Sequence, residues 1–173
     1  MPANVELKAK IRDWERAHSI SRELSGADAQ ILHQEDVFFN VSQGRLKLRI
    51  LGGDRGELIH YDRPDVAGMK TSRYTIARTE DPANLLQILS EALKVTGTVT
   101  KVRSLYLVGQ TRVHLDEVAG LGRFIELEVV LRDTQTEAEG QHIAQELSGV
   151  LGIEALDLLD MAYVDMLNHA RRT

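Results

Sequence analysis

Polar and apolar side chains alternate at every second position along several segments of this chain. In residues 4–10, Val5, Leu7 and Ala9 alternate with Asn4, Glu6 and two lysines. Successive side chains of a β-strand point to opposite faces, so this period predicts half-buried strands. Most of the later predicted strands also carry a charged row on one face. The fold therefore depends on whether these charged rows face solvent or face one another.

The same alternation predicts about eight strands, mostly antiparallel neighbours. A glycine-rich hairpin turn is predicted at 52–56. The predicted strands cover residues 4–10, 30–41, 44–51, 57–63, 70–78, 98–109, 111–118 and 123–131.

Helices are predicted between groups of strands, and their start signals are clear. Asp13 is a plausible N-cap for a helix that runs to residue 24, and Asp81 followed by Pro82 starts a second helix. Thr136 and Glu139 have the spacing of a capping box at the start of a third. Residues 155–170 are predicted as a closing helix with a break near Tyr163.

The composition limits the class of protein. The 173 residues include no cysteine and carry a net charge of −5, which fits one globular domain over residues 1–173 without disulfides or thiolate metal sites. This charge gives no sign of a nucleic-acid partner, and no apolar run reaches about 18 residues, so no membrane span is expected. The N-terminus lacks a secretion signal, which predicts a cytoplasmic protein. The histidines lack zinc-site spacing, and no P-loop motif occurs.

The charged rows are sorted by sign, and for any single row a solvated sheet face is the ordinary arrangement. A barrel with its helices outside would instead gather all the rows in one interior. Unpaired charges there would be very costly, so the interior would need anions for its cations and metal for its carboxylates. A polyphosphate with a hard divalent cation supplies both. The rows are Arg45, Lys47 and Arg49; Lys101 and Arg103; Arg112, His114 and Asp116; and Glu126 and Glu128.

Segments in this order resemble the CYTH, or triphosphate tunnel metalloenzyme, superfamily. The family's ExExK signature stands here as residues 4–8, NVELK, with Asn4 in place of the first glutamate. QEDVFFNV resembles the QxDxYF segment, and GRLKLRI resembles the basic LRxR-like strand. KVRSLYLVG and VHLDEVAGLGRFIELE resemble the KxRxxY and D…GLGxFxExE segments, in particular those of class IV adenylyl cyclases. YVDML is weakly similar to the closing segment of the family.

The resemblance implies an α+β fold: an eight-stranded antiparallel β-barrel that forms a triphosphate tunnel, with helices packed on the outside. It implies a Mg²⁺ or Mn²⁺ cofactor bound by Glu6, Glu126 and Glu128. The implied catalytic residues are Lys8, Lys101, Arg103 and Asp116, the last near the metals or the reacting oxygen. The implied triphosphate-binding residues are Arg45, Lys47, Arg49, Lys70 and Arg112, with Arg73 as an alternative to Lys70. Asp36 is a less secure candidate, and His114 fits hydrogen bonding as well as proton transfer.

Three functions stay open from the sequence. The first is a class IV adenylyl cyclase-like enzyme that converts ATP to cyclic AMP and pyrophosphate. The second is an inorganic or thiamine triphosphatase, and the third is a non-catalytic binder of nucleotide or polyphosphate, which Asn4 favours. The expected partner is a triphosphate small molecule, namely ATP, tripolyphosphate or thiamine triphosphate, without nucleic acid or membrane. The oligomeric state stays open, with a homodimer as one option.

Overall fold

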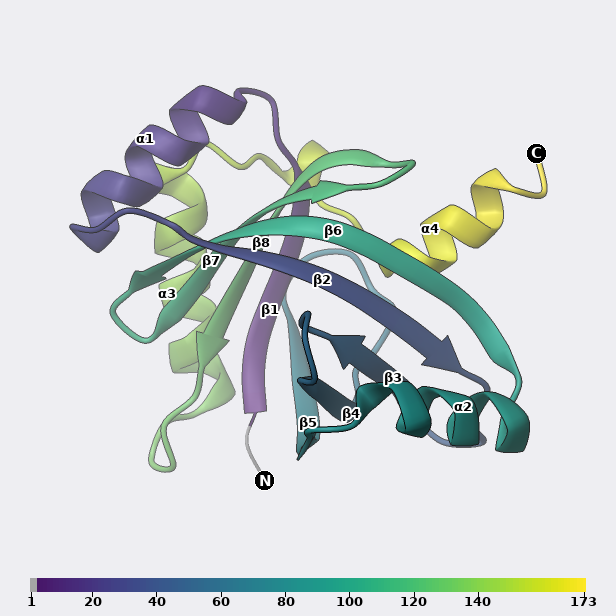
Figure 1. The fold of residues 1–173 in the computed structure, drawn as a ribbon. Helices are drawn as coiled ribbons and strands as arrows, with labels where there is room; N and C mark the ends of the chain where they lie inside the picture. The colour runs from purple at the N-terminus through teal and green to yellow at the C-terminus, as the bar shows by residue number, and fades with distance from the viewer. Residues whose placement is uncertain (1–2) are drawn as a thin grey trace.

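The computed structural model describes residues 3–173, and within them the strands close into an antiparallel barrel (Figure 1). The hydrogen-bonded order around the barrel is β1-β5-β4-β3-β2-β6-β7-β8, and β8 pairs with β1 to close it. The predicted eight-stranded barrel is therefore confirmed. The strands are β1 (Ala3–Lys10), β2 (Gln30–Phe39), β3 (Arg45–Ile50), β4 (Gly56–Asp62), β5 (Lys70–Thr79), β6 (Val95–Val108), β7 (Thr111–Val118) and β8 (Gly122–Val130).

The helices lie outside the barrel, as the sequence predicts (Figure 1). Helix α1 (Trp14–Ser25) packs against β6 and β7, and α3 (Glu137–Val150) packs against β1 and β8. Helix α2 (Pro82–Ala92) contacts β3, and α4 (Tyr163–Ala170) contacts β6. None of the helices in residues 3–173 is long and apolar enough to cross a membrane.

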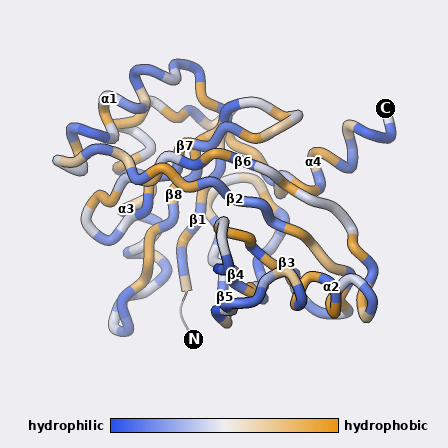
Figure 2. The backbone as a smooth tube through the Cα atoms, viewed as in Figure 1, coloured by the Kyte–Doolittle hydropathy of each residue, from blue (hydrophilic) through white to orange (hydrophobic). Residues whose placement is uncertain are grey.

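On β1, β2, β3, β7 and β8 the apolar row faces these helices, so much of the core is a shell between the barrel and the helices. Leu7, Leu115 and Ile125 are buried in one cluster with Ala17 of α1. Figure 2 shows how hydrophilic and hydrophobic residues interchange along the strands. Because neighbouring side chains of a strand point in opposite directions, the charged rows must fill the inside of the barrel.

The predicted helix starts are confirmed at their caps. The Asp13 carboxylate accepts a hydrogen bond from the backbone N–H of Arg16, and the Asp81 carboxylate accepts one from the N–H of Asn84. Thr136 and Glu139 form the capping box at the start of α3. These side chains satisfy N–H groups that have no partner within the first helical turn.

The predicted closing helix is confirmed only from Tyr163, where the sequence predicts a break, and residues 155–162 do not form its first part. A 3₁₀ turn, η1 (Ala155–Asp157), comes first, and α4 begins only at Tyr163. Between them the backbone lies along the end of β1: the Leu159 N–H donates to the Lys8 carbonyl at 2.9 Å, and Lys70 donates to the Asp160 carbonyl at 3.1 Å. These partners replace the hydrogen bonds that a continuous helix would make.

Candidate active site

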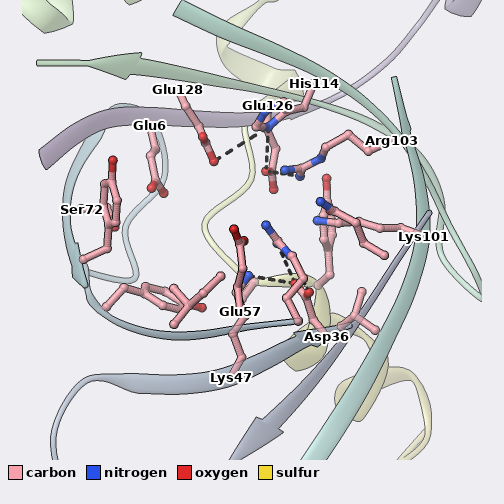
Figure 3. Close-up of a pocket in the computed structure, with 18 of the residues that line it drawn as sticks. Glu6, Asp36, Lys47, Glu57, Ser72, Lys101, Arg103, His114, Glu126 and Glu128 are labelled. Atoms are coloured by element: carbon pink, nitrogen blue, oxygen red, sulfur yellow. Dashed lines mark hydrogen bonds and ion pairs between the residues drawn. The ribbon is translucent and has the colours of Figure 1, made fainter. Parts of the chain in front are cut away.

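The inner faces of the strands enclose a cavity of about 420 Å³ that is rich in charged side chains (Figure 3). Within residues 3–173, the structure places nine of the sequence-predicted site residues in its wall. They are Glu6, Lys8, Lys47, Arg49, Lys101, Arg103, Arg112, Glu126 and Glu128. These side chains come from five strands, so closure of the barrel brings together rows that are far apart in the sequence.

Three of the predicted residues do not line this cavity in the described chain, and their expected positions need correction. Arg45 forms ion pairs with Asp65 and Asp165, beside a separate pocket next to α4. The Lys70 ammonium donates to the carbonyls of Val66 and Asp160. Asp116 is fully buried behind Arg103 and is not exposed to the cavity.

Asp36 organises the basic row of β3. Its carboxylate accepts a hydrogen bond from Lys47 at 2.8 Å and two from Arg49, at 2.8 and 2.9 Å. Burial would raise the pKa of Asp36, but Arg49 and Lys47 hold it well below its usual range. The three groups therefore form a fixed, charged cluster in the cavity wall.

The segment that leads into α4 contributes Ala162 and Tyr163 to the cavity wall. The Lys8 ammonium lies 3.9 Å from the centre of the Tyr163 ring, and the Lys101 ammonium lies 5.2 Å from it. These distances are typical of cation–π contacts. The Tyr163 hydroxyl donates to Asp116 at 3.0 Å, which anchors the ring in this position. Burial, with Arg103 nearby, lowers the pKa of Lys101 to about 7.

Two carboxylates on β8 lie between the cations of neighbouring strands. Glu126 accepts from Lys8 at 3.1 Å through Oε1 and from Arg103 at 2.9 Å through Oε2. Glu128 accepts from Arg112 at 2.9 Å. Burial would raise the pKa of Glu126, but its cationic neighbours, Lys8 above all, hold it well below its usual range. Glu126 is therefore ionised at neutral pH.

Glu6 lies on the adjacent strand with a different balance of charges. Burial and the nearby Glu128 raise its pKa, although Arg63 lies 3.3 Å away and opposes the shift. A divalent cation would relieve this repulsion between carboxylates. The donor set fits such a cation, because hard divalent ions bind carboxylate oxygens.

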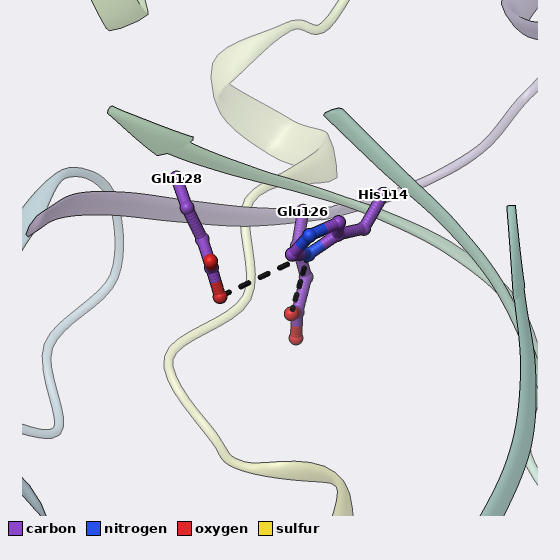
Figure 4. Close-up of side chains that lie close together, drawn as sticks. All are labelled: His114, Glu126 and Glu128. Carbon is purple, nitrogen blue, oxygen red and sulfur yellow. Dashed lines mark ion pairs between the residues drawn. The ribbon is translucent and has the colours of Figure 1, made fainter. Parts of the chain in front are cut away.

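The imidazole of His114 lies near the two β8 carboxylates. One ligand atom each of His114, Glu126 and Glu128 lies within 4.8 Å of the other two (Figure 4). The sequence resemblance implies Glu6 as the third ligand, and the sequence predicts hydrogen bonding or proton transfer for His114, not metal binding. Its position on the face of Arg112 was the only signal in the sequence that it enters the cavity.

Other wall residues carry weak signals in the sequence. Arg63 follows β4 in a loop, where strand period cannot show which way it points, yet it lines the cavity. Arg78 lies at the end of β5 beside Glu57. Tyr163 reaches the cavity from a helix outside the barrel, which no strand pattern predicts.

Apolar and aromatic side chains also line the cavity, namely Leu32, Leu51, Tyr74, Ile76 and Leu105. Leu105 lies further along β6 than Lys101, away from Tyr163. Arg78 and Arg112 line the cavity too, so its wall combines cations with side chains suited to an organic group.

Comparisons with known proteins point to one family. The family model described as the CYTH domain matches residues 2–163. A protein of Methanocaldococcus jannaschii, provisionally named an adenylate cyclase, is 25% identical over 169 residues, which cover 94% of this chain and 97% of the relative.

Solved structures share the fold. A Pyrococcus horikoshii protein superposes with a TM-score of 0.80 at 23% identity, over 94% of this chain and 98% of the other. A Hippeastrum protein, provisionally named an adenylyl cyclase and described as having a dominant triphosphatase activity, superposes with a TM-score of 0.64 at 16% identity, over 98% of this chain and 96% of the other. The match of the family model to most of the chain, with the closed barrel and its charged interior, shows that this chain belongs to the CYTH domain family.

Proposed function

We propose that this chain is a metal-dependent enzyme that acts on a triphosphate inside the barrel, and that its reaction is the cyclisation of ATP to cyclic AMP and pyrophosphate. One observation carries the proposal: the cavity wall has an excess of positive charge, although the chain as a whole has a net charge of −5. Within residues 3–173 the carboxylates of the wall are Glu6, Asp36, Glu57, Glu126 and Glu128. Its cations are Lys8, Lys47, Arg49, Arg63, Arg78, Lys101, Arg103 and Arg112.

An anion with several charges would neutralise this wall. Arginine binds phosphate oxygens through its planar fork, and lysine acts as a compact charge. The wall offers both kinds of group, on strands that surround the cavity. A polyphosphate could thus contact cations on several sides at once, which suits a chain of phosphates better than a single carboxylate.

The apolar wall residues favour a triphosphate that carries an organic group. With the phosphates near Lys8 and Lys101, a nucleoside would lie beside Leu105 and the other apolar side chains of the wall. The ribose 3′ oxygen could then attack the α-phosphorus while the bond to pyrophosphate breaks. Lys8, Lys101 and Arg103 would bind the departing pyrophosphate and neutralise its charge.

The metal would be held by carboxylates at the side of the cavity. Glu6, Glu126 and Glu128 would bind Mg²⁺ or Mn²⁺, and the bound ion would neutralise charge on phosphate oxygens. The cations that now pair with these carboxylates, such as Lys8 and Arg103, would turn to the phosphates. The protein thereby supplies positioning and charge, which are the main contributions in phosphoryl transfer.

A triphosphatase is the second candidate. In that reaction, water attacks the terminal phosphorus, and the same cations bind the substrate. The activity stated for the Hippeastrum protein, which shares this fold, favours this alternative. A third candidate, a binder without turnover, rests on Asn4 in the cavity wall.

Product identification separates these functions. The protein is incubated with ATP, tripolyphosphate or thiamine triphosphate, each with Mg²⁺ and with Mn²⁺, and every product is identified by chromatography. Cyclic AMP with an equal amount of pyrophosphate is the expected result. Release of inorganic phosphate without cyclic AMP would contradict the cyclase reaction and support the triphosphatase reaction.

Thermal unfolding with the same ligands tests the cavity independently of turnover. A ligand that binds only the folded state stabilises it by about 2.7 kcal/mol at a hundredfold excess over its Kd. Tripolyphosphate or ATP with metal should therefore raise the melting temperature. A shift without turnover would favour the non-catalytic binder, and the absence of any shift at millimolar ligand would contradict triphosphate binding in this cavity.

A further inference from the structure

His114 is a buried imidazole whose ring points at two carboxylates without bonding to either. The residue is 3% exposed, and its Nδ1 lies 3.8 Å from Glu128 Oε1 and 3.9 Å from Glu126 Oε2 (Figure 4). Within the described residues, 3–173, this Nδ1 has no hydrogen-bond partner. A buried polar atom without a partner is costly, and in native proteins it is usually satisfied by water, an ion or a ligand.

The distances are too long for hydrogen bonds, which span about 2.7–3.2 Å. They are suitable for two ligands of one ion. Metal–nitrogen and metal–oxygen bonds to small divalent cations are roughly 2.0–2.2 Å, so two ligand atoms on one ion lie about 3 Å apart at right angles and about 4.2 Å apart when opposite. The separations at His114 fall between these limits.

The neighbouring cations leave the facing oxygen of Glu128 available. Arg112 binds Oε2 of Glu128, whereas Oε1 is the atom that faces His114. Glu126 accepts from Lys8 through Oε1 and from Arg103 through Oε2, so Arg103 would have to turn away for Oε2 to bind an ion. Nδ1 of His114 and Oε1 of Glu128 therefore face a common point, and Oε2 of Glu126 lies beside it (Figures 3 and 4).

We propose that His114 supplies a nitrogen ligand, through Nδ1, to the divalent cation bound by Glu126 and Glu128, and that this nitrogen makes the site prefer Mn²⁺ to Mg²⁺. The inference rests on the proposed function only in assuming that the cavity binds a divalent cation. Mg²⁺ binds oxygen almost exclusively and dehydrates reluctantly, whereas Mn²⁺, although it also favours carboxylates, accepts an imidazole ligand more readily. A site built from carboxylates alone would lack this preference.

Pulsed electron paramagnetic resonance of bound Mn²⁺ tests the nitrogen directly. The spectrum is recorded with Mn²⁺ alone and with Mn²⁺ plus tripolyphosphate, a probe that contains no nitrogen. The wild-type protein should show modulation from a directly bound ¹⁴N nucleus. Protein in which only the histidines carry ¹⁵N should show the ¹⁵N pattern instead. If bound Mn²⁺ shows no histidine nitrogen in either sample, or if Mn²⁺ does not bind, the inference is overturned.

Variants assign the nitrogen to one residue and measure selectivity. His114→Gln should remove the nitrogen modulation and raise the Kd for Mn²⁺ by about tenfold or more, with a smaller change for Mg²⁺, measured by calorimetry. His33→Gln is the matched control, because His33 is exposed on β2. Circular dichroism checks that the variants fold. If His114→Gln does not fold, isotope labelling of the wild-type protein still tests whether a histidine nitrogen binds the metal.

The two proposals can fail separately. Nitrogen modulation in a protein that turns over no triphosphate would support the ligand and contradict the enzyme. Turnover with Mn²⁺ that shows only oxygen ligands would support the enzyme and overturn the role of His114. Equal loss of Mn²⁺ and Mg²⁺ affinity in His114→Gln would overturn the claim of selectivity.

Discussion

Arg103 and Asp116 face each other across β6 and β7 in a bidentate ion pair, with two N–O distances of 2.7 Å. Both residues are almost completely buried, and Asp116 also accepts a hydrogen bond from Tyr163. Asp116 thus fixes the guanidinium of Arg103. Nη2 of the same guanidinium also donates a hydrogen bond to Glu126 at 2.9 Å. Asp116 is not among the residues that line the cavity, and its contacts hold the Arg103 side chain in place.

Removal of Arg103 should destabilise the fold as well as the site. Arg103→Ala leaves Asp116 with a buried charge that only Lys101 and Tyr163 still contact, and breaking a buried pair in this way typically costs about 3–5 kcal/mol. Urea unfolding of Arg103→Ala, Asp116→Ala and the double variant measures the coupling. Additive losses in the double variant would show that the two residues do not support each other.

Lys101 should make stability depend on pH. In the fold its pKa is about 7, mainly because it is buried, whereas an unfolded lysine keeps its proton to about pH 10.4. Between these values the unfolded chain binds more protons, so the free energy of unfolding should rise with pH. Urea titrations from about pH 7 to about pH 9.5 should show a steeper rise for the wild type than for Lys101→Met. Parallel curves would mean that Lys101 stays protonated in the fold.

Lys101→Met should also lower turnover by about 10²-fold, because a positioned charge near the reacting phosphates is lost. The fold should survive, since a buried ammonium is costly and methionine fills a similar space. Arg55→Met, in the exposed turn after β3, is the control for loss of a positive charge. Near-normal turnover of Lys101→Met would contradict its place in the site.

Arg45 and Lys47 should differ, although they share one face of β3. Lys47 lines the cavity, whereas Arg45 is bound to Asp65 and Asp165 outside it. Lys47→Ala should raise the KM or Kd for tripolyphosphate by about tenfold, as expected for loss of a charged hydrogen bond. Arg45→Ala should change it much less. Equal effects would show that substrate reaches both positions.

Asn4→Glu should increase the amount by which added metal raises the melting temperature of the protein. Asn4 is 3% exposed in the cavity wall, and its Oδ1 has no hydrogen-bond partner within the described chain. A glutamate there would add a charged ligand about 7 Å from Glu6 along the strand. The variant should melt lower than the parent without metal, because it buries a charge, and should gain more from added Mn²⁺. Asn4→Gln should not show this gain, and equal metal shifts for all three proteins would exclude a metal near Asn4.

Glu6→Gln is the complementary change on the same strand. The variant should abolish turnover if Glu6 binds the metal, because it would remove the only carboxylate of β1. Its melting temperature without metal should not fall, since burial and Glu128 already disfavour the charged form of Glu6. Full activity of Glu6→Gln would show that Glu6 on β1 does not bind the metal.

Local sequence patterns were enough to predict the strands, their two faces and the starts of the first three helices. These features depend on contacts between residues close in the chain, such as the alternation in β1 or the Thr136 and Glu139 box. The same alternation predicted that the charged rows of β3, β6 and β8 lie on faces opposite their apolar rows. Local periodicity is enough for this because side-chain direction repeats every two residues.

Which groups meet inside the barrel depends on contacts between strands that are distant in the sequence. The register between strands sets Arg103 opposite Asp116 and Arg112 opposite Glu128, and period alone cannot fix register between distant strands. Tyr163 enters the cavity because residues 158–162 bond to the end of β1 instead of continuing a helix. Arg45 leaves the site for a similar reason: two carboxylates distant in sequence bind it, and their positions depend on how the whole chain packs.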